Sequence, residues 1–243
     1  MMFWYMAMAV FAAFWIKGIS GFANSLIFGS IMSFRTNTVN ITPMDLLLNI
    51  PANLYFVWKE RKSVSLKVVV PLSLLMLAGS IPGVLWLSVG DATTIKVLFG
   101  FVVIGIAIEM YLRERNPQKQ KASPVLLFFI GLIAGLCAGL FGISAMLAAY
   151  ITRTTENMEA FRGNICAVFF VDNIFRLFLY LATGIMTFES LRLAVTLAPF
   201  MIAGIASGVF FSRFVSEKTV KNIVVCVLFL SGILLVLTNL GIL

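Results

Sequence analysis

Histidine is absent from this 243-residue chain, charged residues make up only 12% of it, and its three cysteines lie far apart. Without histidine the chain has no Ser-His-Asp triad and no HExxH zinc motif. Cys137, Cys166 and Cys226 occur singly in apolar segments and form no CxxC pair, so we expect them to pack as small apolar residues. The sequence therefore predicts no catalytic residue, no metal site and no cofactor.

Long apolar segments make up most of the chain. Hydrophobic residues make up 61% of the chain and the mean hydropathy is +1.04, whereas a soluble domain carries roughly 25% charged residues. The runs are continuous rather than alternating, which predicts an all-α polytopic membrane protein and excludes a β-barrel. Basic cytoplasmic loops explain the net charge of +8, so no nucleic-acid partner is expected. Because no basic residue precedes the first apolar run, we expect that run to stay in the membrane uncleaved.

Two glycine-rich breaks interrupt the apolar runs, at 17–25 (KGISGFANS) and at 131–144 (GLIAGLCAGLFGIS). Glycine costs about 1 kcal/mol against alanine inside a helix, so such clusters mark backbone that bends, packs closely or meets a ligand. Aligning Gly21 with Gly139 also aligns Arg35 with Arg153. The arms beside the first break have roughly 10 to 16 residues, fewer than the roughly 20 needed to span a bilayer. Each break is therefore expected to form the turn of a re-entrant hairpin that other helices shield.

The two breaks open two similar halves. A shift of 125 residues pairs Gly79 and Gly83 with Gly204 and Gly208, and about 14 of the 48 positions from 65 to 112 match their partners. We predict that these four glycines form close-packing helix faces. The predicted organisation is a first membrane repeat at 1–112, a basic linker at 113–123 and a second membrane repeat at 124–243. Besides its hairpin, each repeat is expected to hold three transmembrane helices, at 43–58, 66–88 and 94–112 and at 165–182, 191–211 and 220–240.

Basic residues favour one side of the predicted bundle. They gather at 59–67, 113–121, 153–162 and 213–221, whereas the other side has Arg35, with Lys96 and Arg192 just inside segments. Because a hairpin returns to its own side, each half crosses the membrane an odd number of times and the second repeat is inverted. The bias then predicts a cytoplasmic linker and both termini outside.

Two stripes of polar side chains lie at membrane depth, where an ionised group costs at least about 2.5 kcal/mol and often marks a pathway. The stripes are Asp45, Asn49 and Asn53 in the first half and Asp172, Asn173, Arg176 and Tyr180 in the second. Asn49 corresponds to Asn173 at a shift of 124, which predicts that Asn49, Asn53, Asn173 and Arg176 bind substrate where the repeats meet. Two alternatives stay open: an Asp172–Arg176 pair that only neutralises itself, and asparagines that only join helices.

Lys17 lies beside the first break, where the free N–H groups of the outgoing short helix would attract an anion. Its ammonium would add a full charge to those partial charges. A lysine that only snorkels from the end of a span is the alternative. The residues expected to bind an anion at the two breaks are Lys17, Ser20, Gly21, Asn24 and Ser25 in the first half and Gly139, Gly142 and Ser144 in the second.

The paired breaks resemble those of the TauE/SafE sulfite exporter family of bacterial membrane transporters, and the resemblance covers essentially the whole chain. It extends to Phe161-Arg162-Gly163-Asn164, followed by Phe169-Phe170, Asn173 and Arg176. The resemblance implies transport of sulfite, organosulfonates or related small anions across a prokaryotic cytoplasmic membrane. The chain departs from the family where a glycine run and a proline often follow each break. It has Asn24-Ser25 and Ser144-Ala145 there, so the fold is expected to hold while the substrate is open.

The expected function is therefore that of a secondary transporter for a small anion. A small-anion channel and an Asp-based intramembrane enzyme remain as alternatives. Because the chain has no histidine, proton coupling would use carboxylates, and Asp45 and Asp172 are the expected pair. Sodium coupling stays open, and the sequence indicates neither the direction of transport nor the oligomeric state.

Overall fold

All regular structure in the described part of the chain is helical. The computed structural model describes residues 2–36, 38–115, 124–142 and 157–212, with a few further residues between 147 and 155 and between 214 and 237. The eight helices there are α1 (Met2–Ser20), α2 (Asn24–Ser33), α3 (Thr38–Lys59), α4 (Leu66–Val89), α5 (Ala92–Arg115), α6 (Pro124–Phe141), α8 (Met158–Ala182) and α9 (Phe188–Phe211). The predicted all-α class is confirmed.

Four of these helices, α1, α4, α8 and α9, are long and apolar enough to cross a membrane. Large apolar side chains cover their outer surfaces: Met8, Val89, Phe188 and Val195 are each more than 60% exposed. Water would disfavour so large an apolar surface, whereas lipid chains cover it without penalty. The chain is a multi-pass membrane protein.

Helix α8 begins earlier than the sequence predicted. The side chain of Asn157 accepts a hydrogen bond from the N–H of Ala160 at 2.8 Å and caps the helix, with Glu159 in its first turn. An N-cap asparagine followed by an acidic residue is a common helix start. The start expected at Ile165 was therefore wrong, because α8 already begins at Met158.

The first hairpin joins α1 to α2 through a three-residue turn. Gly21 (φ +83°) and Ala23 (φ +71°) give this turn its left-handed backbone. The ten-residue α2 is too short to span. The other arm, α1, has 19 residues and so extends about 28 Å. The expected limit of 16 residues was wrong for α1, because this helix continues through Lys17 and Gly18.

The second break turns at Gly142, where φ is +73°, directly after α6. Gly142 is thus the counterpart of Gly21, and the alignment of Gly21 with Gly139 was wrong by three residues. Gly139 lies inside α6 and corresponds to Gly18 near the end of α1. Shared composition misled the alignment, because both breaks contain several glycines within a few residues.

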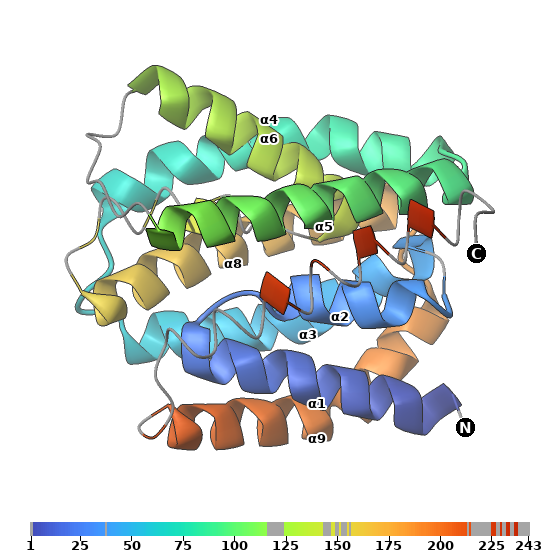
Figure 1. Cartoon of the computed structure of the whole chain (residues 1–243), viewed down its shortest axis with the longest axis horizontal. Helices are drawn as coiled ribbons and strands as arrows, with labels where there is room; N and C mark the ends of the chain where they lie inside the picture. The colour runs from blue at the N-terminus through green and yellow to red at the C-terminus, as the bar shows by residue number, and fades with distance from the viewer. Residues whose placement is uncertain are drawn as a thin grey trace.

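The first arm of each hairpin packs against a long helix of the other predicted half: α1 lies along α9, and α6 lies along α4 (Figure 1). Glycines make both contacts close. A Cβ atom placed on Gly208 would lie 3.0 Å from the Cα of Gly18, and one placed on Gly83 would lie 3.0 Å from the Cα of Gly139. The prediction of close-packing glycine faces is confirmed, although the partners are the hairpin arms.

Helices α3 and α8 pack against each other, and the two helices carry the two polar stripes. Helix α3 contacts α9, and α8 contacts α4, so the stripes lie between the two glycine-packed pairs (Figure 1). Ser144, residues 116–123 of the linker and most of the predicted helix at 220–240 lie outside the described residues. The division into two repeats stays a prediction.

Candidate functional site

The turn between α1 and α2 is braced from both sides. The Ser20 hydroxyl lies 2.7 Å from the carbonyl oxygen of Phe22 and 2.9 Å from that of Ile16. On α8, Arg162 donates from Nη2 to the carbonyl oxygen of Ile19 and lays its methylene groups against Gly21. A cation at the C-terminal end of α1 complements the helix dipole there. Ser20 and Gly21 therefore shape the turn.

Lys17 is fully buried beside this turn. Its ammonium donates to Oδ1 of Asn49 and Oδ1 of Asn53, each at 2.7 Å, and to Oδ1 of Asn24 at 3.2 Å. The three acceptors are neutral carboxamides, so they solvate the charge without cancelling it. Lys17 points into the protein rather than toward a membrane surface, which contradicts the snorkelling alternative.

Asp45 is the carboxylate of the first half. The hydroxyl of Ser25, at the start of α2, donates to its Oδ2 at 2.6 Å. Asn49 donates from Nδ2 to Ser25 Oγ at 3.2 Å and to the Asp45 carbonyl oxygen at 3.0 Å. The buried Oδ1 of Asp45 has no hydrogen-bond partner among the described residues. The Oδ1 atom of Asp45 is thus able to accept a further hydrogen bond.

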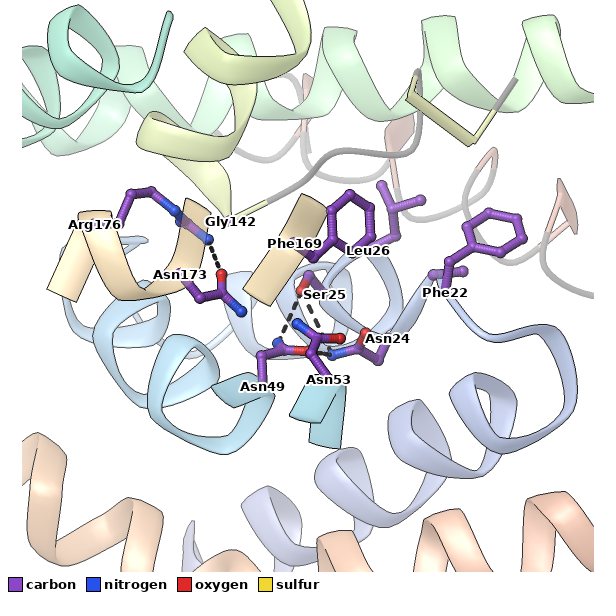
Figure 2. A pocket seen from close by; sticks show the side chains of 11 residues that line it. Phe22, Asn24, Ser25, Leu26, Asn49, Asn53, Gly142, Phe169, Asn173 and Arg176 are labelled. Atoms are coloured by element: carbon purple, nitrogen blue, oxygen red, sulfur yellow. Dashed lines mark hydrogen bonds between the residues drawn. The ribbon is translucent and has the colours of Figure 1, made fainter. Parts of the chain in front are cut away.

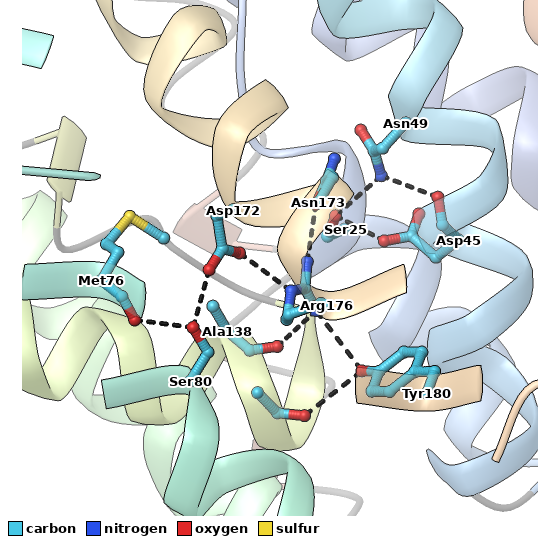
Figure 3. Close-up of polar contacts among 11 residues, drawn as sticks. Ser25, Asp45, Asn49, Met76, Ser80, Ala138, Asp172, Asn173, Arg176 and Tyr180 are labelled. Carbon is cyan, nitrogen blue, oxygen red and sulfur yellow. Dashed lines mark hydrogen bonds and ion pairs between the residues drawn. The ribbon is translucent and has the colours of Figure 1, made fainter. Parts of the chain in front are cut away.

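Arg176 is the centre of the second cluster (Figure 3). Its Nε donates to Oδ2 of Asp172 at 2.8 Å, its Nη2 to Oδ1 of Asn173 at 2.7 Å, and its Nη1 to the carbonyl oxygen of Ala138 at 2.5 Å. Nη1 also lies 3.4 Å from the Tyr180 hydroxyl. The guanidinium is therefore held on three sides, and the predicted Asp172–Arg176 pair is present.

Both clusters border one small pocket (Figure 2). Its cavity has a volume of about 20 Å³, which is room for about one water molecule. The described lining residues are Phe22, Ala23, Asn24, Ser25, Leu26, Asn49, Asn53, Gly142, Phe169, Asn173 and Arg176. The site is therefore assembled from the first turn, α2, α3, the second turn and α8.

The structure brings most of the predicted site residues together. Seven line the pocket: Asn24, Ser25, Asn49, Asn53, Gly142, Asn173 and Arg176. Lys17, Asp45 and Asp172 each stand one hydrogen bond behind a lining residue. Ser20 and Gly21 lie in the turn, and Gly139 lies in the contact between α6 and α4. Ser144 lies outside the described residues.

Several residues around the site were not predicted, among them Ser80, Phe22 and Phe169. Ser80 of α4 donates from Oγ to Oδ1 of Asp172 at 2.8 Å, while Phe22 and Phe169 line the pocket. Ser80 could have been found, because it follows Gly79 on the small-residue face of an apolar helix. Phe22 lies in the first break and Phe169 in the segment of family resemblance, but both are apolar members of a set of 23 phenylalanines, so neither was expected to line the site.

The comparisons with known proteins agree with this architecture. No curated protein and no solved structure matches the chain. The family model for the sulfite exporter TauE/SafE matches residues 5–235. That range includes both turns, all the described helices that carry the two clusters, and every pocket residue. The chain therefore belongs to the sulfite exporter TauE/SafE family of membrane transporters.

Proposed function

We propose that this protein is a secondary transporter that carries sulfite, an organosulfonate or a related small sulfur-containing anion across the cytoplasmic membrane. One observation carries the proposal: two buried cations, Lys17 and Arg176, stand at the same small pocket in the middle of the helices. Ionised side chains at membrane depth are retained mainly where they serve transport or binding. An anion in this pocket would lie close to both.

The start of α2 adds to this positive field. Residues Asn24, Ser25 and Leu26 form its first turn and line the pocket, and no side chain caps that turn. The first N–H groups of a helix have no partner within the helix, and they attract anions. A sulfite or sulfonate group offers three oxygen acceptors to such donors.

Charge balance supports coupling to a proton. Lys17 and Arg176 together carry the opposite charge to Asp45 and Asp172, so the four buried groups are neutral as a set when all are ionised. An arriving anion adds an unbalanced negative charge in a medium that solvates charge poorly. Protonation of one carboxylate restores neutrality, and Asp45 and Asp172 are the groups that we propose for this step.

The small volume of the pocket supports a carrier over a channel. The cavity holds about one water molecule, so an anion with four or more heavy atoms enters only after the helices move. A carrier alternates between states that open to one side, whereas a channel keeps a continuous path. The glycine-packed pairs α1 with α9 and α6 with α4 would move as units in such a transition.

The two halves are proposed to be inverted repeats, with the linker in the cytoplasm and the termini outside. The packing of each first hairpin arm on a long helix of the other half supports this arrangement. Helix α1 meets α9 at Gly18 and Gly208, and α6 meets α4 in the same way at Gly139 and Gly83. Transporters built from inverted repeats place their substrate where the repeats meet. The pocket is lined by α2 and α3 of the first proposed repeat and by α8 of the second, which supports this arrangement.

Transport by the purified protein in liposomes tests the proposal. We expect saturable uptake of sulfite or methanesulfonate that unlabelled anion on the far side accelerates, which is the signature of a carrier. The variant Lys17→Met, which removes the charge and keeps most of the side-chain volume, should abolish uptake. Flux that never saturates would instead indicate a channel, and no flux of any small anion would refute the proposal.

A further inference from the structure

The four asparagines that line the pocket all point their carboxamide oxygens at a buried cation. Lys17 Nζ is the donor to Asn24, Asn49 and Asn53. Arg176 Nη2 is the donor to Asn173 (Figure 2). Ammonium and guanidinium groups only donate hydrogen bonds. Each bond therefore fixes which end of the carboxamide is the oxygen, and the NH2 group of each asparagine faces the other way.

Two of these NH2 groups are left free. The Nδ2 atom of Asn24 donates to Asn49 Oδ1 at 2.9 Å, and that of Asn49 donates to Ser25 Oγ at 3.2 Å. The Nδ2 atom of Asn53 is fully buried and has no hydrogen-bond partner in the described structure. No hydrogen bond within the described residues engages the Nδ2 atom of Asn173 either.

An unpaired buried donor costs free energy until an acceptor reaches it. The cations make these NH2 groups stronger hydrogen-bond donors, because a cation bound to the carboxamide oxygen draws electron density away from the N–H bonds. At the same time the oxygens of all four asparagines are engaged, and the Ser25 hydroxyl already donates to Asp45. The side chains that line the pocket thus offer donors and no free acceptor, and the unpaired Oδ1 of Asp45 stands behind Ser25, outside the lining.

We propose that Asn53 and Asn173 are the specificity-determining residues of the transport site, and that they select oxyanions whose oxygens all accept hydrogen bonds. Besides attracting the anion, Lys17 and Arg176 hold these two carboxamides in position. The assignment rests on the proposed function. An anion of the same charge that carries an O–H group, such as bicarbonate, brings a donor for which no lining side chain has a free acceptor, so it binds more weakly.

A matched pair of anions tests this selection in the parent protein. Nitrate and bicarbonate are both planar, singly charged and built on three oxygens, and they differ in one O–H group. We expect nitrate and methanesulfonate to bind at least tenfold more tightly than bicarbonate at a pH of about 8, measured by calorimetry on purified protein. Equal affinities would overturn the assignment while leaving anion transport standing. Binding of none of the three would overturn both.

Isosteric variants test the two residues. Asn53→Asp and Asn173→Asp keep the oxygen that accepts from Lys17 or Arg176, and they replace the free NH2 group by an acceptor. Added negative charge weakens both anions alike, so the ratio of nitrate to bicarbonate affinity isolates the lost donor. We expect this ratio to fall at least threefold in each variant. Asn164→Asp, in the same helix but away from the pocket, should leave it unchanged. A ratio unchanged in both pocket variants would make these asparagines structural.

Discussion

Gly18 and Gly208 lie in direct contact: a Cβ atom placed on Gly18 would lie 2.8 Å from the Cα of Gly208. The equivalent contact joins Gly139 of α6 and Gly83 of α4, at 2.9 Å. In both places a hairpin arm lies on a long helix with no room for a side chain. Lys17 directly precedes one contact, and the Ala138 carbonyl that binds Arg176 directly precedes the other. The glycine contacts thus help to fix the positions of Lys17 and of the Ala138 carbonyl that binds Arg176.

Alanine at Gly139 should destabilise the protein. Its Cβ would lie 2.5 Å from the carbonyl oxygen of Ser80, and backbone atoms cannot move aside without separating α6 from α4. Overpacking of this kind costs about 1–3 kcal/mol. We expect a clear fall in the melting temperature in detergent. Gly105→Ala is the control, because nothing lies within 4 Å of its Cβ position; equal melting of the two variants would contradict the close contact.

Gly142→Ala should weaken anion binding more than it weakens the fold. Its φ of +73° costs an alanine roughly 1–2 kcal/mol. The new methyl group would also stand 3.4 Å from Asp45 Oδ2 and 3.9 Å from Arg176 Nη1, at the edge of the pocket. Gly184 has the same φ with open space around it, so Gly184→Ala measures the backbone strain alone. We expect at least a tenfold loss of anion affinity in Gly142→Ala and none in Gly184→Ala. The prediction fails if both variants keep the parent affinity.

Much of the architecture was predictable because it depends on patterns that one sequence displays. Continuous apolar runs predicted the membrane helices, and a 125-residue shift revealed the glycines of α4 and α9. The stripes of α3 and α8 predicted most of the residues that line the pocket, since helical spacing puts them on one face. Polar residues within membrane helices usually face the protein interior and mark a binding site or pathway.

The contacts between distant segments were not predictable. Nothing in the sequence says that α1 packs on α9 instead of on its own half, because both faces are apolar and lipid does not distinguish them. The exact turn glycine was also misjudged: backbone φ separates Gly142 from Gly139, and composition does not. Likewise, the orientation of the Asn53 carboxamide follows from Lys17, 36 residues away in sequence.

The topology makes a separate prediction. In a chain whose native cysteines are replaced by alanine, Ile242→Cys should react with a membrane-impermeant maleimide on intact cells, because the termini are expected outside. Gln118→Cys, in the basic linker, should react only after the membrane is permeabilised. The reverse pattern would invert the proposed orientation. It would leave the pocket and its residues unaffected.

The pair Asp172–Arg176 makes the last prediction, which concerns coupling. The ion pair of 2.8 Å is buried on both sides, with 3% of Arg176 and 1% of Asp172 exposed. While Asp172 is ionised it competes with an anion for the guanidinium. Protonation of Asp172 releases that competition, so we expect anion affinity to rise as the pH falls from 8 to 5.

Two variants separate charge from geometry in this pair. Arg176→Lys keeps the charge but loses the planar fork that holds Asp172, Asn173 and Ala138 together, so we expect about a tenfold loss of anion affinity. Asp172→Asn should keep the affinity and flatten its dependence on pH, since the competing carboxylate is gone. Breaking a buried pair destabilises by about 3–5 kcal/mol, so melting must be measured beside binding in both variants. If folded Arg176→Lys binds like the parent and Asp172→Asn keeps the parent's pH slope, the pair is structural. Lys17, which has no carboxylate in direct contact in the described part of the chain, would then be the principal cation for the anion.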